Sequence, residues 1–194
     1  MNDLATPTPR PSGPRPGGRS ARVQAAVHQA VRELQAEGPR ETLAVPAIAA
    51  RAGVTPSTIY RRWGDLPALL ADVAVAQLRP ECAPTDTGSF RGDLRAWLEQ
   101  YLEEMTSAPG RTMLRDVLGA ASTTKASMCA FYCAQQLDTI IARGVARGEP
   151  VASVDRLLDR AVAPLMYRIL FASEPPSAGA VGRWVDELLL DRVV

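Results

Sequence analysis

The sequence predicts an all-α fold with a small N-terminal domain and a larger C-terminal one. Apolar residues recur at helical spacing in every structured stretch, and Gly and Pro residues separate these stretches. No stretch alternates apolar and polar residues in the way a half-buried strand does. Hydrophobic residues make up 46% of the 194 residues, so the chain can bury a substantial core.

The first third of the chain predicts a tail followed by three helices. Residues 1–18 hold five prolines and three glycines without an apolar run, which is typical of a disordered segment rather than of a targeting signal. The spacing of apolar residues then predicts helices over about 20–37, 46–52 and 56–63. We expect residues 19–66 to form one domain.

Residues 67–194 are expected to form the second, larger helical domain. A fourth helix begins near Pro67 after a capping Asp65, and Pro164 is expected to kink a later helix because it cannot donate a backbone hydrogen bond. Pro109 and Gly110 are expected to break the chain between two helices. The predicted helices cover about 67–78, 94–105, 113–118, 124–147, 153–171 and 177–190.

Charge is unevenly distributed along the chain, whose net charge is +1. Residues 1–66 hold nine arginines against five acidic residues, which gives +4, whereas the remaining residues carry −3. A basic first third indicates a polyanionic partner for that part of the chain. No apolar run approaches the roughly 18 residues that a membrane-spanning helix needs, so we expect no membrane association.

Cysteine and histidine usage argues against metal and cofactor chemistry. Cys82, Cys129 and Cys133 occur without a secretory signal, so we expect a reducing, cytoplasmic environment. Cys129 and Cys133 lie one helical turn apart and are either small core residues or a thiol or soft-metal site. With His28 as the only histidine and no phosphate-binding loop, we expect no metal, no cofactor and no enzymatic activity.

The stretch GVTPSTIYRRW at residues 53–63 predicts a short helix after a tight turn. Ile59 and Trp63 pin one edge to the core, and Thr55 is expected to cap the helix. The remaining polar side chains suit the recognition helix of a helix-turn-helix, which places its N-terminal residues in the DNA major groove. A merely solvated face is the alternative. The candidate DNA-binding residues are Thr55, Pro56, Ser57, Thr58, Tyr60, Arg61 and Arg62.

Residues 43–70, LAVPAIAARAGVTPSTIYRRWGDLPALL, resemble the DNA-binding domain of the tetracycline-repressor (TetR) family. The motifs AIAARAGV and T-x-x-T-I-Y, the aromatic Trp63 and the capped helix with Leu69 and Leu70 carry this resemblance. Three later segments, DTGSFRGDLRAWL, ARGVARGEP and LDRAVAPLMYRILF, are similar to C-terminal regions of an actinobacterial-type subgroup. The resemblance implies a homodimeric transcriptional regulator, usually a repressor, that binds double-stranded DNA at a palindromic operator and is released by a small molecule.

The resemblance also assigns roles within the short helix. Thr55 to Thr58 begin the recognition helix, and Tyr60 with one of the two arginines contacts phosphates or base edges. An arginine here is expected to make a bidentate contact to guanine, worth roughly 1–3 kcal/mol of discrimination. Whether Arg61 or Arg62 makes this contact stays open at this point.

Two positions depart from the family pattern. Ala44 stands where the family often has a threonine, and Leu66 where it commonly has a lysine. Both changes remove anchors for phosphate, so we expect weaker binding to the DNA backbone than is usual. The arginines of the tail either compensate by contacting DNA, as flexible arms do, or are inert.

The C-terminal helices predict a dimer and an effector pocket. Helices at about 153–171 and 177–190 have apolar faces too broad for one buried edge, so we expect them to form a four-helix bundle with their copies, the alternative being an intrachain core. The chain is also expected to hold a largely apolar ligand. The candidate pocket residues, each of which is otherwise an ordinary core residue, are Trp97, Tyr101, Met105, Met113, Tyr132, Met166 and Tyr167.

Two other classes of protein compete with a DNA-binding regulator. A helical enzyme or carrier would use the helix-turn-helix only structurally, but it would need a catalytic constellation, and no such motif occurs in the sequence. A helical adaptor without nucleic acid would leave the polar face of residues 60–62 and the basic first third unexplained. The sequence therefore favours the regulator.

Overall fold

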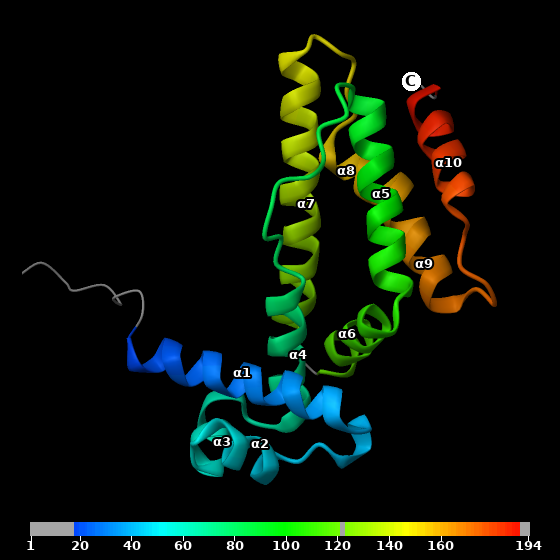
Figure 1. Ribbon diagram of the computed structural model, residues 1–194. Helices are drawn as coiled ribbons and strands as arrows, with labels where there is room; N and C mark the ends of the chain where they lie inside the picture. The colour runs from blue at the N-terminus through cyan, green and yellow to red at the C-terminus, as the bar shows by residue number, and fades with distance from the viewer. Residues whose placement is uncertain (1–17, 121–122, 191–194) are drawn as a thin grey trace, which may run out of the picture. The chain divides into compact units, whose positions relative to one another are not determined.

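The computed structural model describes residues 18–120 and 123–190, which are helical throughout apart from turns and loops, as predicted (Figure 1). Contacts divide the chain into two compact units, Met1–Leu66 and Pro67–Val194. The tail predicted at residues 1–18 lies, except for Gly18, outside the described residues. In the described part of the chain, no helix is both long and apolar enough to cross a membrane.

The N-terminal unit consists of three helices whose apolar stripes meet in one small core. Figure 1 shows α2 and α3 next to each other on the same side of α1. Val27 and Val31 of α1, Ile48 of α2 and Ile59 of α3 have no exposed surface. The helical segments of this unit are α1 (Arg19–Glu37), a 3-10 turn (Arg40–Thr42), α2 (Val45–Ala52) and α3 (Pro56–Trp63).

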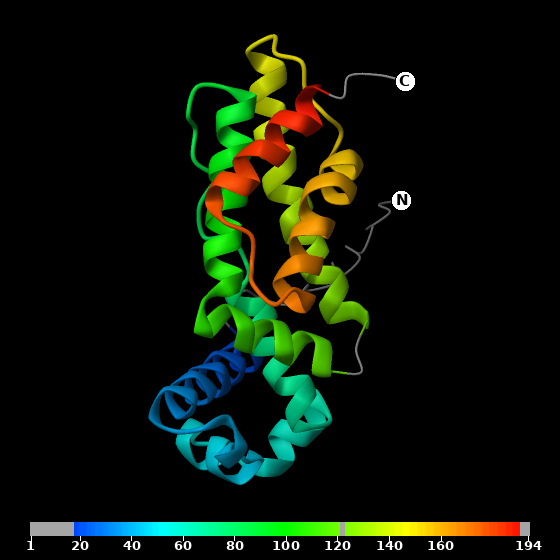
Figure 2. The same cartoon turned by 90° about the vertical axis from the view of Figure 1, so that its right-hand side faces the viewer.

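The C-terminal unit is arranged around α5, which contacts α6, α7, α9 and α10. Both views place α9 and α10 on the same side of this unit (Figures 1 and 2). The helical segments are α4 (Leu66–Gln77), α5 (Phe90–Thr106), α6 (Ala108–Gly119), α7 (Thr123–Ala146), α8 (Val154–Leu157), a π-helical segment (Leu158–Val162), α9 (Ala163–Phe171) and α10 (Ala178–Leu190).

The main core of the C-terminal unit follows the apolar spacing of the sequence. The stripe predicted for α5 is buried, and Leu94 at its centre has no exposed surface. Leu137 and Ile140 of α7 and Leu165 of α9 are equally buried in the same cluster. Because burying a side chain of this size contributes about 1.5–3 kcal/mol, this shared core accounts for much of the unit's cohesion.

Pro164 is accommodated by a widened helical turn that ends just before it. The backbone N–H of Ala163 donates to the carbonyl oxygen of Leu158, five residues earlier, within the π-helical segment. Proline has no N–H and its ring crowds the preceding turn, so a regular α-helix would be interrupted at this point. The helix predicted over 153–171 is therefore present as three consecutive segments, and a π-turn accompanies the proline where a kink was expected.

The break predicted at Pro109 and Gly110 is wrong in position, because α6 already begins at Ala108. Pro109 lies in the first turn of α6, where a missing N–H costs no intrahelical hydrogen bond. Ser107 caps this helix, since its Oγ accepts the N–H of Gly110 at 3.1 Å. A Cβ at position 110 would lie 1.9 Å from the carbonyl oxygen of Glu104, so only glycine fits this close turn.

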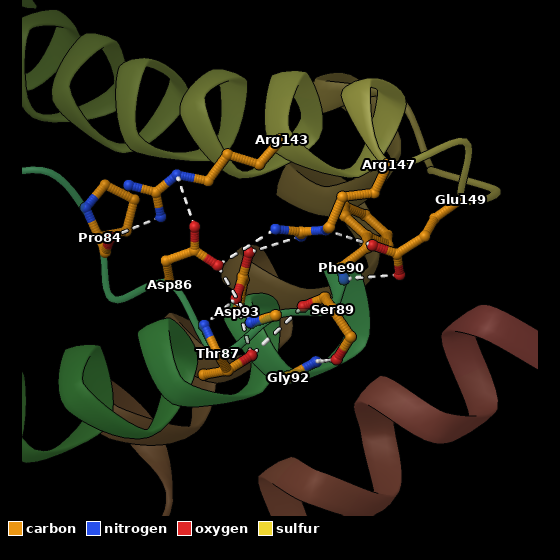
Figure 3. A network of polar contacts seen from close by, with 11 residues as sticks. Pro84, Asp86, Thr87, Ser89, Phe90, Gly92, Asp93, Arg143, Arg147 and Glu149 are labelled. Atoms are coloured by element: carbon orange, nitrogen blue, oxygen red, sulfur yellow. Dashed lines mark hydrogen bonds and ion pairs between the residues drawn. The ribbon is translucent and has the colours of Figure 1, made fainter.

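A buried ion pair fastens the start of α5 to the end of α7 (Figure 3). The carboxylate of Asp93 has no exposed surface and accepts Nη2 of Arg147 at 2.8 Å. The same carboxylate accepts the backbone N–H of Thr87 at 2.6 Å and its Oγ1 at 2.7 Å. Three donors therefore compensate the cost of burying this charge.

Further contacts widen this pair into a network that we call the Arg147 clasp, which consists of Asp86, Thr87, Asp93, Arg143, Arg147 and Glu149. Arg147 also contacts Glu149 through Nε at 2.5 Å, and Glu149 accepts the backbone N–H of Phe90 at 2.8 Å. Arg143 donates to the carbonyl oxygen of Pro84 at 2.7 Å. The clasp joins the sequence segments 86–98 and 142–150, which are far apart in the chain.

The clasp lowers the pKa of its two innermost carboxyl groups. Burial alone raises the pKa of Asp93, but the hydrogen bonds from Thr87 and Arg147 outweigh it and bring this pKa below its ordinary value. The hydrogen bond from Arg147, with that from the Phe90 backbone, lowers the pKa of Glu149. A carboxylate with a lowered folded-state pKa stabilises the fold above its unfolded-state pKa, and this contribution is lost as the pH falls through the folded-state value.

We expect Arg147→Gln to lower the melting temperature more than Arg143→Gln, which removes a more peripheral arginine of the clasp. The larger effect arises because Asp93 would keep its burial but lose its cation. The difference between Arg147→Gln and the wild type should narrow as the pH falls from about 4, the ordinary carboxyl range, through the lowered folded-state pKa values of Asp93 and Glu149. Thermal melts followed by circular dichroism at stepped pH measure this. Equal effects of the two substitutions at neutral pH would contradict the central place of Arg147.

Candidate nucleic-acid interface

One edge of α3 is buried and the opposite edge is exposed. Ile59 has no exposed surface, and the half-buried Trp63 lies one turn further along the same edge, with its ring 6.2 Å from that of His28 on α1. Ser57, Tyr60 and Arg61 are exposed, and Tyr60 retains 51% of its surface. Three polar side chains of different length therefore share the exposed face of a short helix whose opposite edge packs against the core.

The turn between α2 and α3 depends on Gly53. Its backbone is left-handed, with φ 65° and ψ 33°, a conformation that residues with a side chain rarely adopt. The N–H of Gly53 donates to the carbonyl of Ala50 at 3.3 Å, and that of Val54 donates to Ala49 at 3.0 Å. These bonds close α2 and fix the direction in which α3 begins.

Thr55 holds the N-cap position of α3, but its side chain does not cap the helix, so that prediction is wrong. Its Oγ1 lies 3.0 Å from Oγ1 of Thr58 instead, and its carbonyl accepts the N–H of Thr58 at 2.9 Å. Pro56 is the first residue of α3, as predicted. The helix thus starts with a pair of hydroxyl groups that bind each other.

Arg62 is held against the start of α1. Its Nη1 donates to Oγ of Ser20 at 2.7 Å and to the carbonyl oxygen of Ser20 at 3.0 Å. Its Nη2 donates to Oε1 of Gln24 at 2.6 Å, and its guanidinium carbon lies 5.2 Å from the centre of the Trp63 ring. The planar guanidinium therefore bridges two helices that are about forty residues apart in sequence.

Arg61 is exposed like its neighbour Arg62 but differs from it in its contacts. Its side chain is exposed and makes no hydrogen bond or ion pair with any residue in the part of the chain that the structure describes. The sequence left open whether Arg61 or Arg62 contacts DNA, and the bonding of the two side chains favours Arg61. Arg62 is occupied inside the unit, and Arg61 is available to an external partner.

The other arginines and threonines near α3 are mostly engaged within the unit. Arg51 of α2 forms ion pairs with Glu33 at 3.3 Å and with Glu37 at 2.8 Å, and its hydrogen bond lowers the pKa of Glu37. The N-cap of α2 is Ala44, which has no side chain to offer, and Oγ1 of Thr42 donates to a carbonyl at 2.7 Å. Neither Arg51 nor Thr42 is therefore free to replace the phosphate contacts that are expected to be missing at Ala44 and Leu66.

The candidate pocket residues fall into two groups in the C-terminal unit. Trp97 and Tyr101 stack at 5.3 Å between ring centres, and Met166 packs into the same main core. Met113 and Tyr132 belong to a second cluster against α4. The remaining members of that second cluster are Ala74, Val75, Val117, Met128 and Cys129.

Tyr101 brings a polar group into this apolar surrounding. Burial raises the pKa of its hydroxyl well above the ordinary value, and this hydroxyl is hydrogen-bonded to the thiol of Cys133. Met105 of α5 is almost completely buried. Tyr167 does not join either group, because it is 66% exposed and its ring lies 5.2 Å from that of Phe171 on the outside of α9.

The same outer surface of α9 carries further apolar side chains. Phe171 is 72% exposed and Leu170 is 38% exposed. Next to them, the guanidinium of Arg168 lies 5.1 Å from the centre of the Trp184 ring of α10. Large exposed aromatic residues that cluster in this way are typical of interaction surfaces.

Two family models match the chain. Residues 27–73 match the model described as bacterial regulatory proteins, tetR family, and residues 84–188 match the tetracyclin repressor-like C-terminal domain. The chain is 30% identical over 161 residues to the DNA-binding transcriptional repressor TetR of Mycobacteroides abscessus, a match that spans 77% of this chain and 83% of the relative. It is 29% identical over 154 residues to the regulator AqdR of Rhodococcus erythropolis, spanning 77% and 74%.

Solved structures agree with these matches. The TetR family transcription regulator SCO0332 superposes with a TM-score of 0.65 at 30% identity, covering 89% of this chain and 98% of that one. A TetR regulator from Rhodococcus sp. RHA1 shares the fold, with a TM-score of 0.63 at 20% identity over 91% of this chain and 100% of that one. With both domains matched, the resemblance seen in residues 43–70 is confirmed, and the chain belongs to the tetR family of bacterial regulatory proteins.

Proposed function

We propose that this DNA-binding transcriptional regulator is a repressor that binds a palindromic operator as a homodimer and is released by a small molecule. The observation that carries the proposal is the different fate of two adjacent arginines on α3. Both are exposed, but Arg62 bonds to Ser20 and Gln24 within the unit, whereas Arg61 lies on the same face as Ser57 and Tyr60 without a bond to any described residue. A helix held rigidly by one face and polar on the other is what major-groove recognition requires.

Each residue of the exposed face has a role that follows from its length and charge. Ser57 is short and lets the helix backbone approach the base edges closely. Tyr60 reaches a phosphate through its hydroxyl, and Arg61 donates two hydrogen bonds to O6 and N7 of a guanine. The hydroxyl pair of Thr55 and Thr58 lies at the start of the same helix and offers a further contact to the sugar-phosphate backbone.

Phosphate anchoring is expected to come mainly from the start of α1. Ala44 and Leu66 supply no polar group, and Arg51 is engaged by two glutamates. Arg19 and Arg22 are exposed in the first turn of α1, the same turn that Arg62 holds against α3. The tail that precedes them carries two more arginines and extends this basic region in sequence, which supports a role for it as an arm on the DNA.

The homodimer is proposed to form through the helices of about 153–171 and 177–190. The exposed aromatic pair Tyr167 and Phe171 supports this surface, because burying both side chains in an interface would remove apolar surface from water. A two-fold axis would pair α9 and α10 with their copies in a four-helix bundle. Two recognition helices related by the same axis then suit a palindromic operator.

The effector is proposed to be largely apolar and to bind in the C-terminal unit beside α5 and α7. The aromatic stack of Trp97 and Tyr101 and the methionines at 113 and 166 supply an apolar surrounding of adaptable shape. The Tyr101 hydroxyl is a polar group that can orient a ligand. Release from DNA requires that the effector bind one conformation of the dimer more tightly than the other.

Arg61→Ala is expected to weaken binding to the specific operator by roughly 5- to 150-fold, the equivalent of 1–3 kcal/mol. Binding to scrambled DNA should fall only slightly, because a single charge is lost. Gel-shift titrations on the DNA upstream of the protein's own gene measure both affinities. Arg115→Ala, which removes an exposed arginine of α6, is the matched control and should leave the specific affinity unchanged. Equal losses on specific and scrambled DNA would contradict base reading by Arg61.

Arg62→Ala is expected to loosen α3 rather than to change sequence preference. The substitution removes the bonds to Ser20 and Gln24, so backbone amides of α3 should exchange hydrogen faster while those of α7 do not change. Arg62→Lys should rescue little, since an ammonium group cannot reproduce the two-pronged contact. Hydrogen exchange followed by mass spectrometry measures this. Unchanged protection of α3 in Arg62→Ala would show that the contact does not hold the helix.

Phe171→Glu is expected to shift the protein from dimer to monomer at concentrations where the wild type is dimeric. The reason is that a carboxylate would be buried without a partner in the proposed four-helix bundle. Phe131→Glu is the matched control, because Phe131 is 57% exposed on α7, outside the proposed surface. Sedimentation velocity reports both. A dimer that survives Phe171→Glu but dissociates with Phe131→Glu would move the interface to α7.

A further inference from the structure

Two thiols on α7 lie near Tyr101 of α5 in the C-terminal unit, and one of them shares a cluster with two methionines. Cys129 and Cys133 lie one turn apart on the same face of α7, a spacing that places Cβ atoms about 5–6 Å apart. Met128 of α7 and Met113 of α6 pack in the same cluster as Cys129, whereas Cys133 packs against the main core. The hydroxyl of Tyr101 on α5 interacts with both thiols.

Both cysteines are free, and each is half-buried. Burial raises the pKa of the Cys129 and Cys133 thiols, although a hydrogen bond from Tyr101 opposes this rise at Cys133. The thiol of Cys129 donates to the carbonyl oxygen of Lys125 at 3.5 Å. Thiols that stay protonated react slowly with oxidants, so this pair is poorly suited to sensing peroxide.

The donor set selects a particular class of ligand. Zinc and similar ions take three or four strong ligands, and among residues 18–120 and 123–190 no three His, Cys, Asp or Glu side chains come together to hold a metal ion. Soft monovalent cations such as Cu(I) differ, because they prefer thiolate and thioether sulfur over nitrogen and oxygen. Two cysteines on one helix face, one of them in a cluster with methionines, match this preference.

We propose that Cys129 and Cys133 form a two-thiolate binding site for Cu(I), with the thioether of Met113 on the Cys129 side as a weaker additional ligand. On binding, each thiol releases its proton to the solvent and two sulfur–copper bonds form, with no change of oxidation state. The loaded site carries one negative charge. The Tyr101 hydroxyl stabilises this charge by donating a hydrogen bond to the sulfur of Cys133. The site does not depend on DNA binding.

The test is a competition for Cu(I) between the full-length protein and a coloured Cu(I) chelator, bicinchoninate, under anaerobic conditions. The wild type is expected to withdraw one Cu(I) per chain, and the Cys129→Ser, Cys133→Ser double variant none. Cys82→Ser is the matched control, because Cys82 is exposed and outside the cluster, and it should bind like the wild type. Met113→Leu, which keeps the volume but removes the thioether, should weaken binding about tenfold.

Proton release from the wild type supplies a second readout that needs no variant. In weakly buffered solution near neutral pH, each Cu(I) bound should release about two protons, because both thiols start protonated. Circular dichroism checks that the double variant keeps its helices. The proposal is overturned if the wild type withdraws no Cu(I), if the double variant withdraws as much as the wild type, or if Cys82→Ser abolishes binding. Zn(II) held as tightly as Cu(I) by the cysteine pair would overturn it as well.

Discussion

The contact between Arg62 and the start of α1 is the constraint on which the DNA-binding face depends. Ile59 and Trp63 alone would leave a helix of eight residues free to roll about its buried edge. The three hydrogen bonds from Arg62 to Ser20 and Gln24 attach α3 to the start of α1 beside this buried edge. With the helix so fixed, Arg61 projects to solvent in a defined direction. Adjacent and chemically identical residues thereby differ in their surroundings, since Arg62 bonds within the unit, and the proposed role of Arg61 in recognition follows from this difference.

The C-terminal unit depends on a comparable fixation at the Arg147 clasp. The segments 86–98 and 142–150 are brought together because Arg147 bonds to Asp93 and Asp86, and because Glu149 accepts the backbone N–H of Phe90 (Figure 3). The clasp lies where α5 begins and α7 ends. It therefore fixes how these two helices, which carry Tyr101 and Cys133, are aligned along their axes.

The features that could be predicted from the sequence are those that local chemistry decides. Apolar spacing predicted the helices, Gly53 predicted the turn before α3, and Pro56 predicted the first residue of α3. The features that could not be predicted depend on contacts between distant residues. Nothing near Arg62 in sequence indicates Ser20 as its partner, and nothing near Arg51 indicates the two glutamates of α1. Thr55 was misread because its hydroxyl contacts Thr58 instead of a backbone N–H. Spacing alone also does not distinguish a core face from a surface face, as the exposure of Tyr167 shows.

The division between the two arginines is tested most directly by methylation protection of operator guanines at saturating protein. This method reports access to guanine N7, the atom that a bidentate arginine covers in the major groove. We expect a guanine in each half-site to be protected by the wild type and by Arg62→Ala, and to become reactive with Arg61→Ala. Protection that persists in Arg61→Ala but disappears in Arg62→Ala would contradict the account, because Arg62 would then leave α1 to read the base.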